Sequence, residues 1–296
     1  MNAATIVALL GITAALAYGV ADFFAAKSAK SVGPVLSAAL VSIFSALLFA
    51  IIFVIFFRSH THLTTAGFWY AAASGTVLSF SVALFYIGLA AGPVSIVSPL
   101  SSMYPLVTTA VALVVFHARL STREIIGVIL TVFGIAAAAG LLNLKRSNYR
   151  LAKGPVFALF TALAFGIGYA FLAQSIKRID WQLASLVDYG FAAIAFLVFI
   201  PIIKGKEVIS PRAIKRGLKN KFILVTSVVQ LAGIASLEIG ISRSTVTGGA
   251  VVTAISASYP IITIFLAVKH FDEKARLIPL AGAFIGVAGI IVLSLG

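Results

Sequence analysis

The sequence predicts an all-α integral membrane protein with ten transmembrane helices, arranged as two inverted five-helix repeats. Three observations lead to this fold class: a very apolar composition, ten apolar runs of membrane-spanning length, and a polar motif that occurs twice. Together they exclude a soluble globular domain.

The composition sets the class of protein. Of the 296 residues, 61% are hydrophobic and 10% are charged, against roughly 25% charged in a typical globular domain. Met1 to Thr5 contain no basic residue, so we expect the first apolar run to be a retained span and not a signal peptide. Cysteine is absent, which excludes disulfides and thiolate metal sites. The net charge of +14 resides in short loops, so we expect contact with anionic membrane lipids and no nucleic acid partner.

Ten apolar runs of about 20 residues, the length that crosses a bilayer roughly 30 Å thick, lie between charged or Pro/Gly-marked turns. The connections are short, so successive spans should be antiparallel neighbours. The runs extend from Thr5 to Ala26, Pro34 to Phe57, Ala66 to Ala90, Pro93 to Phe116, Arg123 to Leu142, Gly154 to Ile176, Gln182 to Ile203, Lys221 to Ile241, Val246 to Lys269 and Leu277 to Leu295.

The second half of the chain repeats the first. The segment from Ser98 to Thr108 returns as Thr253 to Thr263, a shift of 155 positions, and a shift of 147 places residues 16–19 (LAYG) on residues 163–166 (LAFG). Five spans in each half make the halves cross the membrane in opposite senses, which is an inverted repeat. We therefore place the two repeats at residues 1–148 and 149–296. Glycines in the fifth and tenth spans also correspond, and we expect them to let helix backbones approach closely: Gly127, Gly134, Gly282, Gly286 and Gly289.

Each copy of the repeated motif carries a polar stripe. At about 100° per residue, steps of three, three and four residues keep four polar side chains on one side of a helix. Two interpretations stay open: the hydroxyls bond helices together, at about 0.6 kcal/mol per contact, or the twin stripes line a central cavity and bind a solute. The tyrosine in each stripe favours the cavity. The stripe residues are Ser98, Ser101, Tyr104 and Thr108 in the first copy and Thr253, Ser256, Tyr259 and Thr263 in the second.

Other residues within the spans extend this candidate site. Prolines in the fourth and ninth spans free backbone carbonyls, and we expect them to act as hinges: Pro99, Pro105 and Pro260. Further candidates for solute contact are Tyr18, Tyr169 and Gln230.

Three acidic residues lie within or near spans. A charge at mid-bilayer costs at least about 2.5 kcal/mol, so an intramembrane carboxylate indicates function. Asp22 and Glu238 are candidates for coupling a proton or binding a cation. The alternatives are interfacial ion pairs, of Asp22 with Lys27 and of Glu238 with Arg243. Asp188 lies only two helical turns after Trp181, near the start of its span, and we expect it near a membrane surface.

The basic residues predict the orientation of the chain. Sixteen Lys and Arg residues lie in loops after odd-numbered spans and six on the other side, which together are the 22 in the chain. By the positive-inside rule the odd-numbered loops are cytoplasmic and both termini lie outside. The most basic loop contains Ser210-Pro211, which predicts a short surface helix that ends at Lys219.

Sequence patterns for other activities are missing. The four histidines lack metal-ligand spacing, no Gly-rich phosphate loop occurs, and no Ser/His/Asp set shares a span. We therefore expect neither an enzyme nor an ATP-driven pump, and neither a metal nor a cofactor.

The pattern resembles the drug/metabolite transporter superfamily in its ten-helix, EamA-type form. The resemblance covers the whole chain and depends on the two repeats, on Ala15 to Gly19 (ALAYG) where the family often has A-L-x-W-G, and on the Pro-bearing fourth and ninth spans. It also depends on a Glu nine residues before a Gly in each repeat's last helix. Glu273 fits this pattern, whereas Ala118 stands in the first repeat.

The resemblance implies a cavity between the halves, lined by the first, third, fourth, sixth, eighth and ninth spans, and alternating access by rocking of the halves. Family members usually have cytoplasmic termini, which the charge count contradicts. We expect a multi-pass protein of the plasma or inner membrane that moves an amino acid, a nucleobase or a cationic compound, with or without proton coupling. The alternatives are an uncoupled facilitator and a non-transporting scaffold or lipid-binding protein.

Overall fold

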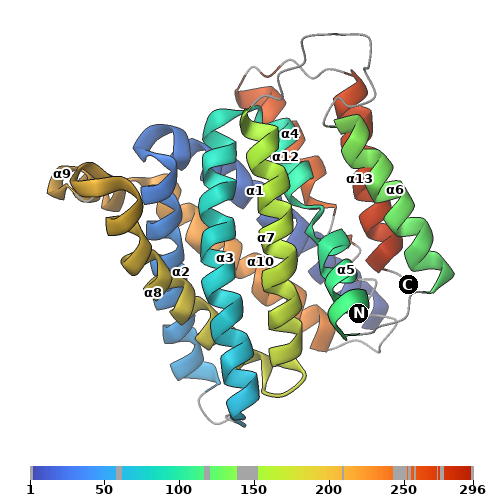
Figure 1. Ribbon diagram of the computed structural model, residues 1–296, viewed down its shortest axis with the longest axis horizontal. Helices are drawn as coiled ribbons and strands as arrows, with labels where there is room; N and C mark the ends of the chain where they lie inside the picture. The colour runs from blue at the N-terminus through green and yellow to red at the C-terminus, as the bar shows by residue number, and fades with distance from the viewer. Residues whose placement is uncertain are drawn as a thin grey trace.

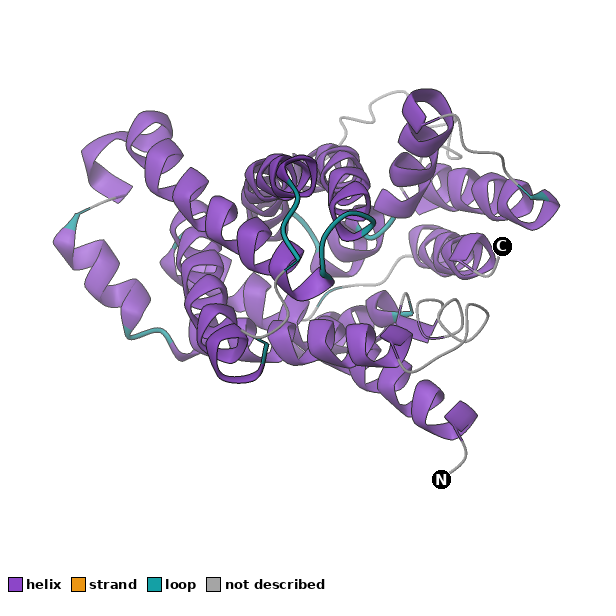
Figure 2. Ribbon diagram, turned by 90° about the horizontal axis from the view of Figure 1, so that it is seen from below, coloured by secondary structure: helices purple, strands orange, loops and turns teal. Residues whose placement is uncertain are grey.

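The computed structural model describes residues 3–57, 62–116, 121–138, 153–208, 210–242, 252, 255–256, 258–271, 273 and 277–294 (Figure 1). Every regular element in these ranges is a helix, as Figure 2 shows. This confirms the predicted all-α class. The helices are α1 (Ala3–Val32), α2 (Pro34–Phe56), α3 (Thr65–Ala91), α4 (Val94–Ser101), α5 (Tyr104–Phe116), α6 (Thr122–Ala138), α7 (Lys153–Ile176), α8 (Trp181–Val208), α9 (Pro211–Leu218), α10 (Lys221–Ser242), α12 (Tyr259–His270) and α13 (Leu277–Ser294).

The helices follow the predicted apolar runs. Within the described ranges, six spans are long and apolar enough to cross a membrane, the fourth of them made of α4 and α5 together. Helices α9 and α10 add a seventh if this pair, bent by 55°, counts as one span. Shorter apolar segments lie in α6, α12 and α13. Ten crossings stay a prediction.

The two repeats interlock across the middle of the molecule. Helix α3 lies along α7, and its counterpart α10 lies along α1. Likewise α5 contacts α7, and the matching α12 contacts α1. Helices α6 and α13, the last of each repeat, lie side by side (Figure 1). These paired contacts are what an inverted repeat with an approximate twofold axis should give.

The fourth span is broken, as its two prolines indicated. Helix α4 ends at Ser101 and α5 begins at Tyr104, so the four polar residues from Ser98 to Thr108 do not follow one continuous helix, as the predicted stripe requires. Pro99 lies inside α4, and Pro105 lies in the first turn of α5, where a missing N–H is tolerated. The second repeat shows the same start: Pro260 lies in the first turn of α12.

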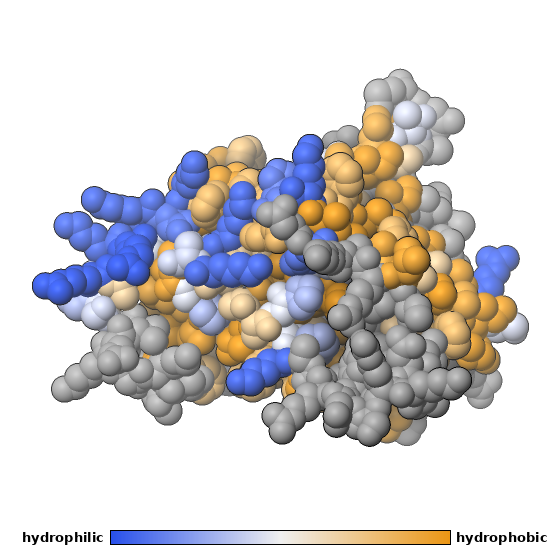
Figure 3. All heavy atoms as spheres, turned by 90° about the horizontal axis from the view of Figure 1, so that it is seen from above, coloured by the Kyte–Doolittle hydropathy of each residue, from blue (hydrophilic) through white to orange (hydrophobic). Residues whose placement is uncertain are grey.

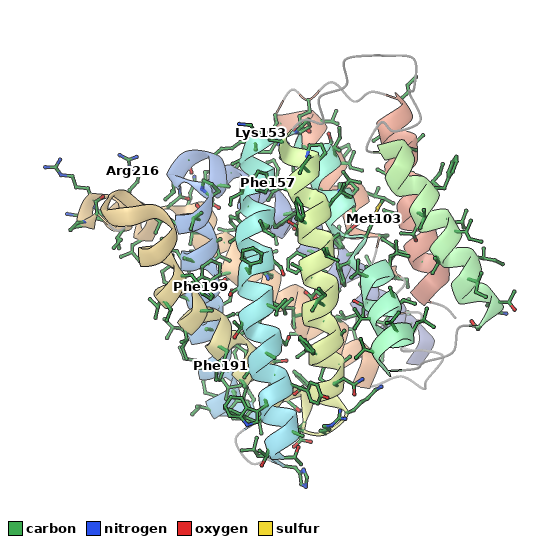
Figure 4. The ribbon with its side chains drawn as sticks, viewed as in Figure 1. Met103, Lys153, Phe157, Phe191, Phe199 and Arg216 are labelled. Carbon is green, nitrogen blue, oxygen red and sulfur yellow. The ribbon has the colours of Figure 1, made fainter. Side chains whose placement is uncertain are left out.

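The glycines of α6 and α13 let these two helices touch backbone to backbone. A Cβ on Gly134 would collide with the backbone N and Cα of Gly286 and would lie 2.8 Å from the Gly282 carbonyl oxygen. A Cβ on Gly289 would lie 2.5 Å from the Thr131 backbone nitrogen. Met103, labelled in Figure 4, reaches this pair, because its Cε would collide with a Cβ on Gly286. The packing role predicted for the glycines is confirmed at Gly134 and Gly289.

The predicted surface helix is present as α9. The Ser210 hydroxyl accepts a hydrogen bond from the Ala213 N–H at 3.2 Å, and proline occupies the first turn. Figure 3 shows hydrophilic side chains gathered toward the side of the molecule that carries α9, beside a largely apolar surface. This arrangement suits a helix that lies at the membrane surface.

The carboxylate of Glu273 caps the N-terminus of α4. Pro93, at the N-cap of α4, provides no side-chain cap. The Glu273 carboxylate, from the second repeat, accepts hydrogen bonds from the N–H groups of Val94 at 2.7 Å and Ser95 at 2.9 Å. A carboxylate at a helix N-terminus satisfies unpaired N–H groups and complements the helix dipole. Glu273 therefore joins the two repeats at α4.

We expect Glu273→Ala to lower the free energy of unfolding by about 1–2 kcal/mol, because both cap hydrogen bonds are lost. Thermal melting of the detergent-solubilised protein measures this change, and Glu273→Gln, which keeps one acceptor, should give an intermediate value. Asp180→Asn, which removes the charge of another carboxylate but keeps an acceptor for the His62 N–H, serves as the control. Equal melting points for Glu273→Ala and the control would contradict the cap.

Candidate solute-binding site

Asp22 lies in α1, within the candidate span Ala8–Val32. The predicted first span ends at Ala26, so Asp22 lies four residues, roughly 6 Å at 1.5 Å per residue, from that end. The Ser98 hydroxyl of α4 donates a hydrogen bond to Asp22 Oδ2 at 2.5 Å. The carboxylate therefore faces the broken fourth span, inside the membrane region.

Lys27 has other neighbours than Asp22. Its Nζ lies 4.5 Å from the centre of the Phe23 ring and 5.4 Å from that of Phe222. These are cation–π distances. The structure thus favours Asp22 as part of a polar site over the interfacial Asp22–Lys27 pair.

Tyrosines from both repeats surround the Asp22 region. The rings of Tyr18 and Tyr259 meet edge to face with centroids 5.8 Å apart. At the equivalent contact between the repeats, Tyr104 meets Phe165, the counterpart of Tyr18, with centroids 6.1 Å apart, and Tyr169 lies 4.7 Å from Tyr104. The sequence-predicted tyrosines thus come together in two symmetry-related aromatic groups.

Electrostatic proximity joins these two groups into one site. The Tyr259 side chain lies close enough to Asp22, Tyr104 and Tyr169 for their charges to interact with it, and it is hydrogen-bonded to Ser102. We call residues related in this way electrostatic neighbours. Tyr86 of α3 is also a neighbour of Asp22, and its buried hydroxyl has no hydrogen-bond partner among the described residues. Asp22 and the tyrosines other than Tyr86 are half-buried, so they are neither sealed in the core nor on the outer surface.

The two threonines of the stripes make helix contacts. Thr108 donates a hydrogen bond to the Gly166 carbonyl at 3.0 Å, and Thr263 donates one to the Gly19 carbonyl at 3.3 Å. Gly19 and Gly166 are equivalent in the repeat and lie against the other helix: a Cβ on Gly19 would lie 2.6 Å from Ile262 Cβ. The interpretation as helix bonding therefore fits Thr108 and Thr263, while Ser98 faces Asp22.

The other predicted residues are placed as follows. Ser101 is buried, and its hydroxyl oxygen has no hydrogen-bond partner in the described part of the chain, whereas Ser256 is buried in the equivalent turn. Gln230 of α10 is half-buried, one turn from Gly233, whose Cβ would lie 3.1 Å from the Tyr18 ring. Thr253 and the side chain of Glu238 lie outside the described residues.

Sequence reasoning missed two residues of this region. Tyr86 and Ser102 carry no repeat signal, and Ser102 lies at the break between α4 and α5. Asp188, outside this region, was expected near a surface, and its side chain is 7% exposed. For Asp188 the available signal was its type alone, a carboxylate within an apolar run.

The fold and the site define a multi-pass membrane protein built from two related repeats around a central polar cluster. The chain belongs to the EamA-like transporter family, whose model matches residues 5–139 and 152–295, one repeat each. Members of this family are membrane transporters of small solutes. The predicted resemblance is thereby confirmed.

Two further comparisons agree with this assignment. An uncharacterized protein of Methanocaldococcus jannaschii is 32% identical over 131 residues, which cover 43% of this chain and 91% of that protein, so the relative is about one repeat long. A solved structure, titled only as the crystal structure of a protein, aligns with a TM-score of 0.61 at 16% identity, covering 98% of this chain and 97% of the other. The latter likeness concerns the fold alone.

Proposed function

We propose that this chain is a secondary transporter that binds a small organic solute beside Asp22 and carries it across the membrane by alternating access. The observation that carries the proposal is the position of Asp22, which accepts a hydrogen bond from Ser98 within the span Ala8–Val32 and lies close to tyrosines of both repeats. Both repeats supply the site, so a motion that rearranges their contacts changes the site itself.

A cationic or amine-bearing solute suits this site best among the expected classes. A carboxylate inside the membrane is costly unless a cation or a proton compensates it. The faces of Tyr18, Tyr104 and Tyr259 attract a cation through the ring quadrupole, and their hydroxyls offer hydrogen bonds. Amino acids and amine-bearing compounds carry such a group. When the solute leaves, a proton can take its place on Asp22, which would couple transport to protons.

The contacts between helices indicate which parts move. Helix α1 packs on α10 and α12 of the second repeat, and α7 of the second repeat packs on α3 and α5. The closest-packed groups thus mix the two repeats. We propose that alternating access shifts the group of α1, α10 and α12 against the group of α3, α5 and α7, in place of the simple rocking of sequence halves that the resemblance implies.

A ligand screen by thermal shift tests the proposed function. Amino acids, nucleobases and quaternary amines are added to the detergent-solubilised protein, and a ligand at 100 times its Kd should stabilise the native state by about 2.7 kcal/mol. We expect at least one amine-bearing compound to raise the melting point. The double variant Tyr104→Phe/Tyr259→Phe should lose that shift and the solute flux in liposomes.

Tyr189→Phe is the matched control for this experiment, because the Tyr189 ring lies on Phe49 of α2, away from the Asp22 region. It should bind and transport like the wild type. A double variant with unchanged ligand shift and unchanged flux would contradict the proposed site. Flux that never responds to an imposed pH gradient would favour an uncoupled facilitator.

A further inference from the structure

A second buried carboxylate lies where α8 crosses α3. Asp188 of α8 is 7% exposed and Ser74 of α3 is fully buried beside it. Neither Asp188 Oδ1 nor the Ser74 hydroxyl oxygen has a hydrogen-bond partner within the described residues. Asp188 follows the start of α8 by seven residues, roughly 10 Å, so it lies inside the span Trp181–Ile200. An unpaired carboxylate at this place would be costly.

Packing does not require a carboxylate at this contact. The shift of 147 that relates the first and sixth spans places Asp188 on Val41 of α2. There, the same contact between α2 and α10 is made by the Ser227 hydroxyl, which donates to the Val41 carbonyl at 3.3 Å. At the α2–α10 contact, an apolar side chain and a hydrogen-bonded hydroxyl are therefore sufficient for packing. Packing alone does not explain why the α3–α8 contact has the carboxylic acid Asp188.

The described neighbours of Asp188 offer no cation to compensate it. Helix α2 has no ionisable residue, and α3 presents Tyr70 and Tyr86. The nearest basic side chain in the sequence, Arg178, donates to the Gln174 carbonyl at 2.6 Å and covers the Tyr70 ring at 4.8 Å. On α7, Tyr169 is the electrostatic neighbour of Asp188. Lys153, the first residue of α7, lies at the other end of that helix (Figure 4).

The other charges on the packed elements lie farther along the chain. The Tyr189 ring of α8 lies on Phe49, and the first basic residue of α8 after Asp188 is Lys204, more than four turns on. The basic residues of α9 follow α8 at that same far end: Arg212, Lys215 and Arg216.

The contact is also too close for a coordinated metal ion. A Cβ on Gly75 would collide with the Asp188 carbonyl oxygen, so the backbones of α3 and α8 touch beside the carboxylate. A hard cation needs about six oxygen ligands in a shell around it, whereas a proton takes no additional volume. A neutral acid can also donate to the Ser74 hydroxyl oxygen and so relieve both unpaired atoms.

We propose that Asp188 and Ser74 form a proton-binding site, in which Asp188 holds a proton while α3 and α8 are in contact and releases it when they separate. This inference rests on the proposed transport function only for its second part, the release during the transport cycle. Tyr169 is an electrostatic neighbour of both Asp188 and Asp22. It therefore connects the proton site to the solute site without sharing its ligands.

Infrared spectroscopy of the purified protein at neutral pH tests the proton directly and needs no solute. We expect a component of the carbonyl stretch of neutral carboxylic acids that is lost in Asp188→Asn, is kept in Asp22→Asn, and shifts in Ser74→Ala, because the hydrogen-bond partner is lost. A hydrophobic carbodiimide, which adds to protonated carboxylic acids, should label the peptide that contains Asp188 in Asp22→Asn as in the wild type. Asp180→Asn, at the turn before α8, is the matched control and should leave this component and this label unchanged.

Stability separates this site from a structural ion pair. Asp188→Asn has nearly the same shape, and its amide N–H can donate to the Ser74 hydroxyl oxygen as the neutral acid does, so its melting point should equal or exceed that of the wild type. An unchanged infrared spectrum in Asp188→Asn, or a melting point several degrees lower, would overturn the proposal.

The same variants distinguish this proposal from the proposed function. A band that belongs to Asp188, in a protein that neither binds nor moves any solute, would keep the proton site and reject transport. With a solute in hand, Asp188→Asn should retain binding but lose at least about tenfold of the uptake driven by an imposed pH gradient. Gradient-driven uptake equal to wild type would overturn the coupling.

Discussion

Asp22→Asn is expected to reduce solute uptake into liposomes by about tenfold or more. The change removes the negative charge that we propose holds the solute or the coupling proton, and a hydrogen bond to a charged group contributes about 1.5–3 kcal/mol, where 1.4 kcal/mol corresponds to tenfold. Uptake is measured with the compound identified by thermal shift, at saturating and at low concentration. Because the amide keeps the shape of the carboxylate and can still accept from Ser98, the fold should be retained.

Two variants delimit this prediction. Ser98→Ala removes the donor to Asp22 and should have a smaller effect, about fivefold, since the carboxylate stays. Asp180→Asn removes a half-buried carboxylate at the turn before α8 and should have none. Wild-type uptake in a correctly folded Asp22→Asn protein would show that the carboxylate has no part in transport.

The fold could be predicted in most respects because the bilayer constrains the chain so strongly. Apolar runs must be helical to satisfy their backbone groups in lipid, and the repeat then fixes which helices correspond. The break between α4 and α5 was only partly predictable. Pro99 and Pro105 indicated that the helix is disturbed, but the position of the turn depends on contacts with α12 and α13 that the sequence does not show.

The site was predictable in its residue types and less so in its individual roles. Periodicity grouped Ser98 with Thr108, yet the helix break separates them: Ser98 meets Asp22, and Thr108 binds the Gly166 carbonyl. The spacing between Asp22 and Lys27 suggested an ion pair, whereas Phe23 and Phe222 engage the lysine. Which face of a membrane helix meets a partner is decided by tertiary packing, because both faces are apolar in sequence.

Gly134→Leu should be the most destabilising of the substitutions considered for this protein. The Gly134 Cα lies against backbone atoms of Gly286, and backbone atoms cannot rotate aside as a side chain does. A leucine must therefore push α6 and α13 apart, at a cost of about 3 kcal/mol from overpacking and lost contacts. We expect a melting point lower by several degrees, with reduced recovery of monodisperse protein, while Gly134→Ala should give a smaller decrease.

Gly190→Leu is the control for this prediction, because it makes the same substitution where no helix packs against the glycine. Gly190 lies in α8, and a Cβ built there has no atom within 4 Å, so the same change from glycine to leucine meets open space. Both variants raise apolarity and helix propensity equally, and they differ only in what the new side chain contacts. If Gly134→Leu melted like Gly190→Leu, α6 and α13 would not be held by close backbone contact.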